Sequence, residues 1–238
     1  MNLLDSRRDV CYSMAMHLDH FSISSPNLYY GAHRLRLEST LSFYDGGHFA
    51  NGDHANRVFP LGANTYLELN GIVNAESVAD PKNRPWWYGH VQTKGECFTG
   101  FGFRVDTLEE LEAIAKRKNY TIAKAPITRV WPNGYVLRAR SAPSVQTTWP
   151  KGLPNWYWFE DLAMHPSGQP PMSWPNITRP DGVAWIEVGG TEKTMSDWIG
   201  VPGGTFPFRF NGKLPGLYAI GVKTMKGGEI VIRRPSAS

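Results

Sequence analysis

Three times along the chain, a strand pattern is followed directly by a helix pattern, and this recurrence constrains the fold more than any other feature. The three strands lie around Phe21, Phe103 and Trp185, at even spacing. Alternation of apolar and polar residues is typical of a strand with one buried face, and apolar residues three or four apart indicate a helix. The repeated order predicts a mixed α+β protein assembled from related units.

The first unit is predicted to contain a strand, a helix and three further strands. The opening strand covers His17–Ser24, and Ser25-Pro26 has the composition of an N-cap followed by a proline at the first helical position. The helix is expected to run to about Ser39. Strands are then expected over residues 40–44, 56–61 and 65–73, with glycine-containing turns between them.

The second unit carries the clearest helix signal. Thr107 and Glu110 have the spacing of a capping box, in which each side chain accepts a hydrogen bond from the other residue's backbone N–H. We expect a strand before this helix over 100–105, a hairpin around Pro132-Asn133-Gly134 and an aromatic strand over 155–162. In the third unit we expect a strand over 183–188, a helix over 191–199, a strand over 206–210 and a hairpin of 218–224 with 229–233.

These expectations divide the chain into four parts. Residues 1–15 form an N-terminal extension, 16–75 a first module, 76–180 a connecting loop with a second module, and 181–238 a third strand–helix–strand unit. The 24 glycines and 18 prolines interrupt the chain too often for a helical bundle.

Composition narrows the classes of partner. The net charge is +4, but no basic stripe interleaved with aromatic residues is present, so we expect no nucleic-acid binding. The N-terminus lacks the apolar region of a signal peptide and no apolar run approaches a membrane span. Cys11 and Cys97 give neither a disulfide framework nor a zinc spacing. We therefore expect a soluble, cytoplasmic protein that does not bind membranes.

Five short motifs occur in order in the first unit. They are Asp19-His20, Gly46-Gly47, Asn56-Arg57, Pro60-Leu61-Gly62 and Tyr66-Leu67-Glu68-Leu69. This pattern resembles the vicinal oxygen chelate superfamily and, within it, the glyoxalase-like group. The resemblance covers about residues 16–200 and is most specific in the first unit.

The resemblance implies βαβββ modules whose paired, curved mixed sheets enclose a pocket. It also implies a divalent metal (Zn²⁺, Mn²⁺ or Fe²⁺) held by residues from the first and last strand of each module. His20 matches the first ligand, Glu68 the second, and Glu160 the last strand of the second module. The fourth position falls near Gly102, which offers no donor. His165 or His54 would give a two-histidine, one-carboxylate set suited to Fe²⁺.

Further candidates surround this set. Glu160 follows an aromatic run, where burial would raise its pKa and make it a general base, and His54 is a candidate proton shuttle. Asn56 and Arg57 are candidates for binding a substrate carboxylate. Each has a structural alternative, such as a buried core histidine or a surface ion pair. An aromatic wall for a flat substrate is predicted from Trp86, Trp87, Trp156 and Trp158, and packing of the core is its alternative.

Together these features predict a glyoxalase-like, metal-dependent lyase, isomerase or ring-cleaving dioxygenase. Its substrate would be a small molecule with two neighbouring oxygens. Two alternatives stay open, namely a metal-free binding protein of the same fold and metal-free acid–base catalysis by Glu160 with a histidine. The third unit has no assigned role, and covering a sheet edge or contacting the second copy of a homodimer are both compatible with it.

Overall fold

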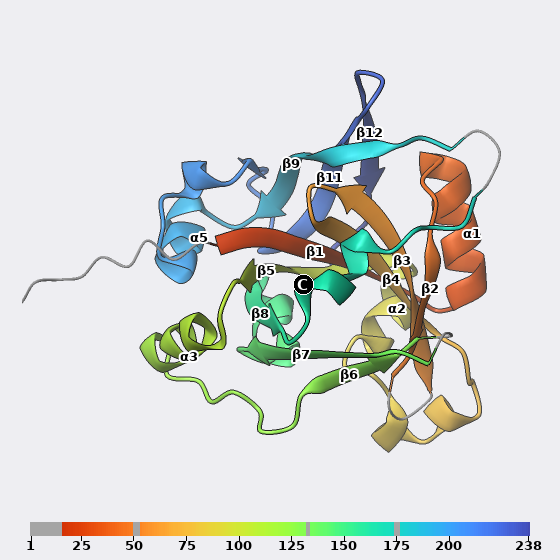
Figure 1. Cartoon of the computed structure of the whole chain (residues 1–238), viewed down its shortest axis with the longest axis horizontal. Helices are drawn as coiled ribbons and strands as arrows, with labels where there is room; N and C mark the ends of the chain where they lie inside the picture. Colours follow the sequence, from red (N-terminus) through yellow and green to blue (C-terminus); the bar gives the residue numbers. More distant parts are fainter. Residues whose placement is uncertain (1–15, 50–52, 132–133, 174–176) are drawn as a thin grey trace, which may run out of the picture.

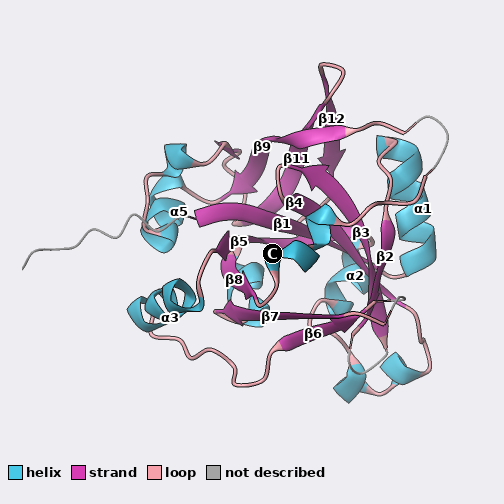
Figure 2. Ribbon diagram, in the orientation of Figure 1, coloured by secondary structure: helices cyan, strands magenta, loops and turns pink. Residues whose placement is uncertain are grey.

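Eight strands of the described residues close into a barrel (Figures 1 and 2). The computed structural model describes residues 16–49, 53–131, 134–173 and 177–238, so the proposed extension over 1–15 lies outside it. The strand order is β1-β4-β3-β2-β6-β7-β8-β5. The strands are β1 (Met16–Ser25), β2 (Tyr44–His48), β3 (His54–Gly62), β4 (Thr65–Ile72), β5 (Cys97–Val105), β6 (Ile127–Val130), β7 (Val136–Ala142) and β8 (Asn155–Phe159).

The pairing of strands is repeated in the two halves of the barrel. β1 runs parallel to β4, with His20 opposite Tyr66, and β5 runs parallel to β8, with Gly102 opposite Asn155. The halves meet where β1 and β5 pair antiparallel and His20 lies opposite Gly102. The barrel therefore has the curved, mixed sheets that the resemblance implies, and position 102 corresponds in the second half to position 20 in the first.

The two long helices of the barrel begin at capping residues. Helix α1 (Leu28–Ser39) starts after Asn27, whose side chain accepts from the backbone N–H of Tyr30. The predicted Ser25 cap is therefore wrong, because β1 continues through Ser25 and the chain turns only afterwards. Helix α3 (Leu108–Arg117) has the predicted capping box of Thr107 and Glu110.

A four-stranded sheet covers one side of the barrel. It has the order β10-β9-β11-β12 and lies above β1 in Figure 1. Its strands are β9 (Pro180–Gly189), β10 (Phe208–Phe210), β11 (Gly216–Thr224) and β12 (Gly228–Arg233), and helix α5 (Glu192–Ile199) follows β9. This unit has the predicted order of elements, but β9 lies between β10 and β11, whereas β1 pairs with the last strand of its module.

One apolar core joins this sheet to the barrel. Ile186 and Val222 of the sheet belong to the same buried cluster as Phe59 and Phe101 of the barrel. The ring of Phe208 packs edge-on against Phe101, with centroids 5.9 Å apart. Burial of these side chains is the main stabilising contribution to their contact.

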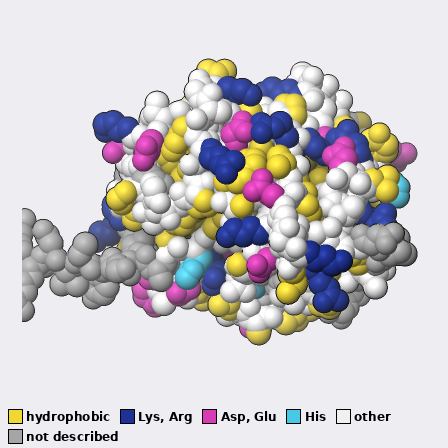
Figure 3. All heavy atoms as spheres, turned by 90° about the horizontal axis from the view of Figure 1, so that it is seen from above, with side chains coloured by type: hydrophobic (Ala, Val, Ile, Leu, Met, Phe, Trp, Pro, Cys, Tyr) yellow, Lys and Arg dark blue, Asp and Glu magenta, His cyan; other side chains and the backbone are white. Residues whose placement is uncertain are grey.

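Short helices occupy the connections. They are η1 (Ser77–Ala79), η2 (Pro81–Asn83), α2 (Tyr88–Lys94), α4 (Val145–Thr148), η3 (Trp149–Lys151), η4 (Leu162–Met164), η5 (Pro166–Gly168) and η6 (Gly203–Thr205). The first strand after α1 was expected over 40–44 but lies over Tyr44–His48. In the part of the chain that the structure describes, no helix is long and apolar enough to cross a membrane. Figure 3 shows basic and acidic side chains interspersed on one face.

Candidate active site

The barrel encloses a cavity of about 550 Å³, within the size range of small-molecule sites. Its two sides differ in chemistry because the inward residues of the two modules differ. The first module contributes mainly polar residues, including His20, Ser22, His54, Asn56, Glu68 and Asn70. The second contributes mainly apolar and aromatic residues, including Trp131, Leu137, Trp149, Tyr157 and Phe159, with Arg129 among them.

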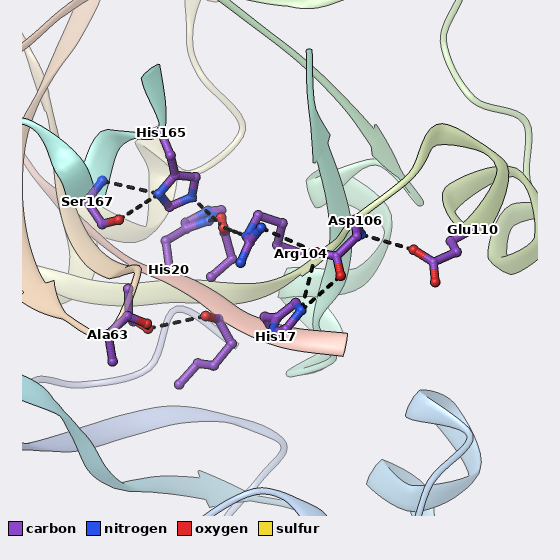
Figure 4. Close-up of polar contacts among 11 residues, drawn as sticks. His17, His20, Ala63, Arg104, Asp106, Glu110, His165 and Ser167 are labelled. Atoms are coloured by element: carbon purple, nitrogen blue, oxygen red, sulfur yellow. Dashed lines mark hydrogen bonds and ion pairs between the residues drawn. The ribbon is translucent and has the colours of Figure 1, made fainter. Parts of the chain in front are cut away.

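A buried carboxylate, Asp19, holds His20 in place. Its Oδ2 accepts from Nδ1 of His20 at 2.6 Å, and its Oδ1 accepts from Nε2 of His165 at 2.8 Å (Figure 4). The strand register shifts between Leu18 and His20, so Asp19 lies in a bulge opposite β5. Bulges redirect side chains in this way near functional sites. The bulge brings two neighbouring side chains together that a regular strand would point to opposite faces.

Both groups of this pair have shifted pKa values. Burial raises the pKa of Asp19, but hydrogen bonds from His165 and His20 outweigh it and lower the pKa to about 2. Burial lowers the pKa of His20, but the hydrogen bond to Asp19 and the charges of Asp19 and Glu68 raise it above its usual value. The pair is therefore a carboxylate with an imidazole that readily takes a proton. Nε2 of His20 has no partner among the described residues.

Glu68 is the buried carboxylate of the cavity. It lies on β4 two residues beyond Tyr66, the partner of His20, and so on the same inward face. Its Oε2 accepts from Nδ2 of Asn56 at 3.0 Å and its Oε1 accepts from Nδ2 of Asn70 at 2.9 Å. Two amides therefore hold this charge in a fixed orientation.

A second Asp–His pair contributes His54 to the cavity wall. Asp53 Oδ1 accepts from Nδ1 of His54, whose ring stacks on Phe49 with centroids 3.9 Å apart. Burial lowers the pKa of His54 and outweighs the hydrogen bond to Asp53 that raises it. His54 pairs with Ile72, four residues along β4 from Glu68. At about 3.3 Å per residue, that offset is about 13 Å along the sheet.

Arg129 is a charged cavity residue that sequence reasoning missed. Its guanidinium carbon lies 3.2 Å from the centroid of the Phe49 ring, and burial lowers its pKa. Ile127, Arg129 and Trp131 alternate along one segment and all line the cavity. The sequence contained a signal for this residue. A hairpin was predicted here, and every second residue of its first strand lies on one face, which could have been expected to point inward.

Several predicted residues do lie in the cavity. His20, Glu68, His54 and Asn56 line it, as do Trp86 and Trp87 from the connecting segment. The structure thus brings together the polar candidates of the first module and one of the two tryptophan pairs. The sequence signal for the two acid–base pairs was the dipeptide Asp-His, which occurs at 19–20 and 53–54.

Other predicted residues lie elsewhere. The side chain of Glu160 is 57% exposed just after β8, with Nη1 of Arg138 at 3.8 Å from its Oε2, so the structure does not bring it to the cavity. Arg57 points outward and donates to Oδ1 of Asp45 at 2.8 Å, which is the surface ion pair named above as its alternative. Trp156 is fully buried and Trp158 half-buried in the core behind the sheet, because inward residues of β8 alternate with them.

These positions allow a test of the metal site that the resemblance implies. The second-module equivalents of His20 and Glu68 are Gly102 and Tyr157, as the matching registers show. Glycine has no donor, and burial raises the pKa of the Tyr157 hydroxyl so that it stays neutral. Both ring nitrogens of His165 already have partners, because its Nδ1 contacts the Ser167 hydroxyl at 2.7 Å and its Nε2 binds Asp19.

The donor set therefore does not fit a four-ligand metal site. Two donors, His20 and Glu68, lie on the inward face, and the ring of Tyr157 lies edge-on to His20 at 4.8 Å, where the other half of the site would be. Among the described residues, no three His, Cys, Asp or Glu side chains cluster closely enough to hold an ion.

A match to the glyoxalase-like domain family places this protein in the vicinal oxygen chelate superfamily, and the barrel of mixed strands agrees with this placement. Within it, the chain belongs to the glyoxalase-like domain family, whose match covers residues 18–189. The resemblance found in the sequence is thereby confirmed. No curated protein matches the chain.

A solved structure shares the fold at low identity, and two others show a more limited similarity. A hypothetical protein from Staphylococcus aureus is 10% identical over 92% of this chain and 85% of its own, with a TM-score of 0.54. Methylmalonyl-CoA epimerase from Mycobacterium tuberculosis is 11% identical over 60% of this chain and 86% of its own, with a TM-score of 0.42. A Streptomyces coelicolor methylmalonyl-CoA epimerase complexed with 2-nitronate-propionyl-CoA is 13% identical over 61% of this chain and 98% of its own, with a TM-score of 0.43.

Proposed function

We propose that the protein is an enzyme of the lyase or isomerase type that moves a proton on a small molecule bound in the barrel cavity. The observation that carries this proposal is the Asp19–His20 pair, because His20 lines the cavity and its Nε2 has no partner among the residues that the structure describes. Of the reaction classes that the resemblance implies, these two need only proton transfer and fit the donors present.

In this proposal His20 is the general base. Nε2 takes a proton from a carbon next to a carbonyl or carboxyl group of the substrate, and the electron pair of the broken C–H bond becomes an enolate. The Asp19 carboxylate orients the ring and stabilises the imidazolium that forms. Nε2 then returns the proton to the same carbon, or to a neighbouring atom as a leaving group departs. Glu68, held by its two amides, adds a further negative charge that favours the protonated imidazole.

Exchange of substrate hydrogen with solvent tests this function directly. Small 2-hydroxy and 2-oxo acids are incubated with the protein in deuterium oxide and followed by NMR. His20→Ala is expected to slow exchange by about 10²–10⁴-fold, the usual contribution of a general base. His33→Ala removes an exposed histidine of α1 and is expected to leave the rate unchanged. Equal exchange by the His20→Ala variant would overturn the proposal.

Metal content decides between this proposal and the metal-dependent enzyme expected from the family resemblance. Purified protein is analysed for zinc, manganese and iron. Stoichiometric metal that disappears in both His20→Ala and Glu68→Gln would favour the metal-dependent reaction, in which these two residues are ligands.

A second candidate is a binding protein without turnover. It is favoured by the aromatic side of the cavity, where Trp131, Tyr157 and Phe159 form one apolar cluster. Quenching of tryptophan fluorescence by a bound acid, with no exchange of its hydrogen atoms, would support this candidate against the enzyme.

A further inference from the structure

We propose that Arg129 anchors an oxyanion of the cavity's ligand, and that the ligand is a planar, largely apolar carboxylate or phosphate. The inference names the substrate class of the proposed function and rests on it only in sharing the cavity. Binding without catalysis is sufficient to test it.

Arg129 is a half-buried cation of the cavity wall, and it has no counter-ion in the part of the chain that the structure describes. Its Nη1 donates to the carbonyl of Thr128 at 3.2 Å, and the ring of Phe49 covers its guanidinium. Within residues 16–49, 53–131, 134–173 and 177–238, no carboxylate lies at salt-bridge distance from it. A charge removed from water is costly unless a charged or hydrogen-bonding partner compensates it. The remaining N–H groups are thus available to an anion that enters the cavity.

Glu68, whose charge acts on Arg129, already has hydrogen-bond partners of its own. Glu68 is close enough for its charge to raise the pKa of Arg129, against the stronger effect of burial. Both oxygens of Glu68, however, accept hydrogen bonds from the amides of Asn56 and Asn70. The carboxylate is therefore oriented by its own strand neighbours, and it forms no ion pair with the arginine.

The other arginine of the cavity wall shows the contrast. Arg84 donates from Nε to the carbonyl of Val78 at 2.9 Å and from Nη2 to that of Ala79 at 3.3 Å. Its guanidinium is used to hold the connecting segment. Among the described residues, Arg129 donates only to the carbonyl of its neighbour Thr128, so its guanidinium does not hold a connecting segment as that of Arg84 does.

The surroundings of Arg129 define the rest of the ligand. Trp131 follows it on the same inward face of the segment, and Leu137 and Phe159 continue the wall. Flat, apolar side chains bind flat, apolar groups, whereas a guanidinium binds carboxylate or phosphate through two parallel hydrogen bonds. An arene or alkene with one oxyanion at its end satisfies both requirements.

A comparison of charged and neutral ligands tests whether binding requires a negative charge on the ligand. Benzoate, phenyl phosphate and the neutral isostere benzamide are titrated into the full chain, and binding is followed by tryptophan fluorescence and calorimetry. We expect benzoate or phenyl phosphate to bind the wild-type protein and benzamide to bind at least tenfold more weakly, roughly the loss of one charged hydrogen-bond partner. Stronger binding of one of the two anions identifies carboxylate or phosphate as the source. Equal binding of benzoate, phenyl phosphate and benzamide, or binding of none of them, overturns the inference.

Two variants then locate the anchor. Arg129→Gln is expected to weaken binding of the anion by roughly 30-fold or more and to leave benzamide unchanged, because it removes one partner of a buried charge pair. Arg138→Gln alters the exposed arginine on the neighbouring strand and is expected to change neither. Undiminished anion binding by Arg129→Gln would overturn the inference. If that variant does not fold, the comparison of the wild-type protein with benzoate and benzamide still decides.

The outcome is separable from that of the proposed function. His20→Ala is expected to keep benzoate binding and to lose hydrogen exchange. A protein that binds benzoate through Arg129 but exchanges no hydrogen supports the anchor and overturns the enzyme. A protein that exchanges hydrogen equally with and without Arg129 supports the enzyme and overturns the anchor.

Discussion

The ring of Tyr157 fills the space that a side chain at Gly102 would need. A Cβ atom placed on Gly102 would lie 2.9 Å from Cε2 of that ring, closer than real Cβ contacts. Tyr157 in turn packs edge-on against His20. The resemblance implies a metal ligand at position 102. In this protein that position is a glycine, and the ring of Tyr157 packs directly against it.

We therefore predict that Gly102→Ala destabilises the protein. The added methyl group forces the Tyr157 ring to move in a closed interior, which costs about 1–3 kcal/mol. Gly89→Ala is the matched control, because nothing lies within 4 Å of its added methyl group and alanine favours helix α2. Denaturant unfolding measures both variants. A Gly102→Ala protein as stable as the wild type would show that the ring is free to shift.

The buried Asp19 should be among the most sensitive single positions. Asp19→Asn leaves His20 and His165 without the carboxylate that both bind, and breaking a buried charged pair costs about 3–5 kcal/mol. Asp106→Asn changes an exposed carboxylate near His17 and is expected to cost far less. Equal effects of the two substitutions in thermal or denaturant unfolding would contradict this ranking.

The stabilising effect of His20 should depend on pH. Its pKa is raised in the folded protein, so its contribution is fully present below the unfolded pKa of 6.5 and is lost as pH rises through the folded pKa. The loss of unfolding free energy caused by His20→Ala is therefore expected to be larger at pH 5 than at pH 9. A loss that grows with pH would mean that His20 is neutral in the folded state.

The stabilising effect of Asp19 should depend on pH in the opposite sense, and in the acidic range. Its pKa falls from 3.8 to about 2 on folding, so its contribution is present above pH 3.8 and is lost as pH falls through about 2. Asp19→Asn should accordingly differ less from the wild type at pH 2 than at pH 6. Unfolding curves at the two values, with Asp106→Asn alongside, measure this difference.

Substitutions of two glutamates, Glu68 in the cavity and Glu160 at the surface, should have different effects. Glu68→Gln places an amide N–H₂ against one of the donors of Asn56 and Asn70, so we expect a loss of about 1–3 kcal/mol and impaired ligand binding. Glu160→Gln removes one partner of an exposed pair and is expected to change stability by less than about 0.5 kcal/mol. Loss of hydrogen exchange in Glu160→Gln would instead return this residue to the base role predicted from its aromatic neighbours.

An ion network fastens the end of the chain to the barrel. The side chain of Glu96 is 3% exposed and its Oε1 lies 2.8 Å from Nη2 of Arg34 and 2.6 Å from Nε of Arg234. Glu96→Gln is expected to lower the free energy of unfolding by about 3 kcal/mol and to increase the exchange of backbone amide hydrogens in β12. Lys193→Gln breaks an exposed pair with Asp197 and should have no measurable effect.

Local patterns in the sequence predicted most of the elements. The capping box at Thr107 and the strand predicted over 183–188 depend on neighbouring residues, and both are present, the strand as part of β9. The opening strand over His17–Ser24 was predicted too, but the bulge at Asp19 depends on the pairing with β5 far along the chain. Pairing between distant strands leaves no local signal.

The same limit applies to the site. Glu160 stands beside aromatic residues in the sequence, yet β8 ends at Phe159 and the next side chain turns to solvent. The residue that matches Glu68 in the second half is Tyr157, which becomes evident only from the registers of the two parallel strand pairs. The side chain of Arg57 lies on the outer face of its strand and that of Arg129 on the inner face. Which face of each strand points inward is set by the closed barrel and not by the sequence of either segment.

Both halves of the barrel come from one chain, so each can differ from the other at every position. Two identical halves would present every group twice, and a guest could enter in either of two equivalent poses. Here the imidazole of His20 and the carboxylate of Glu68 lie on one wall, and the rings of Trp131, Tyr157 and Phe159 lie on the other, beside the guanidinium of Arg129. A molecule held between them has a defined head and tail, and so only one of its faces meets His20.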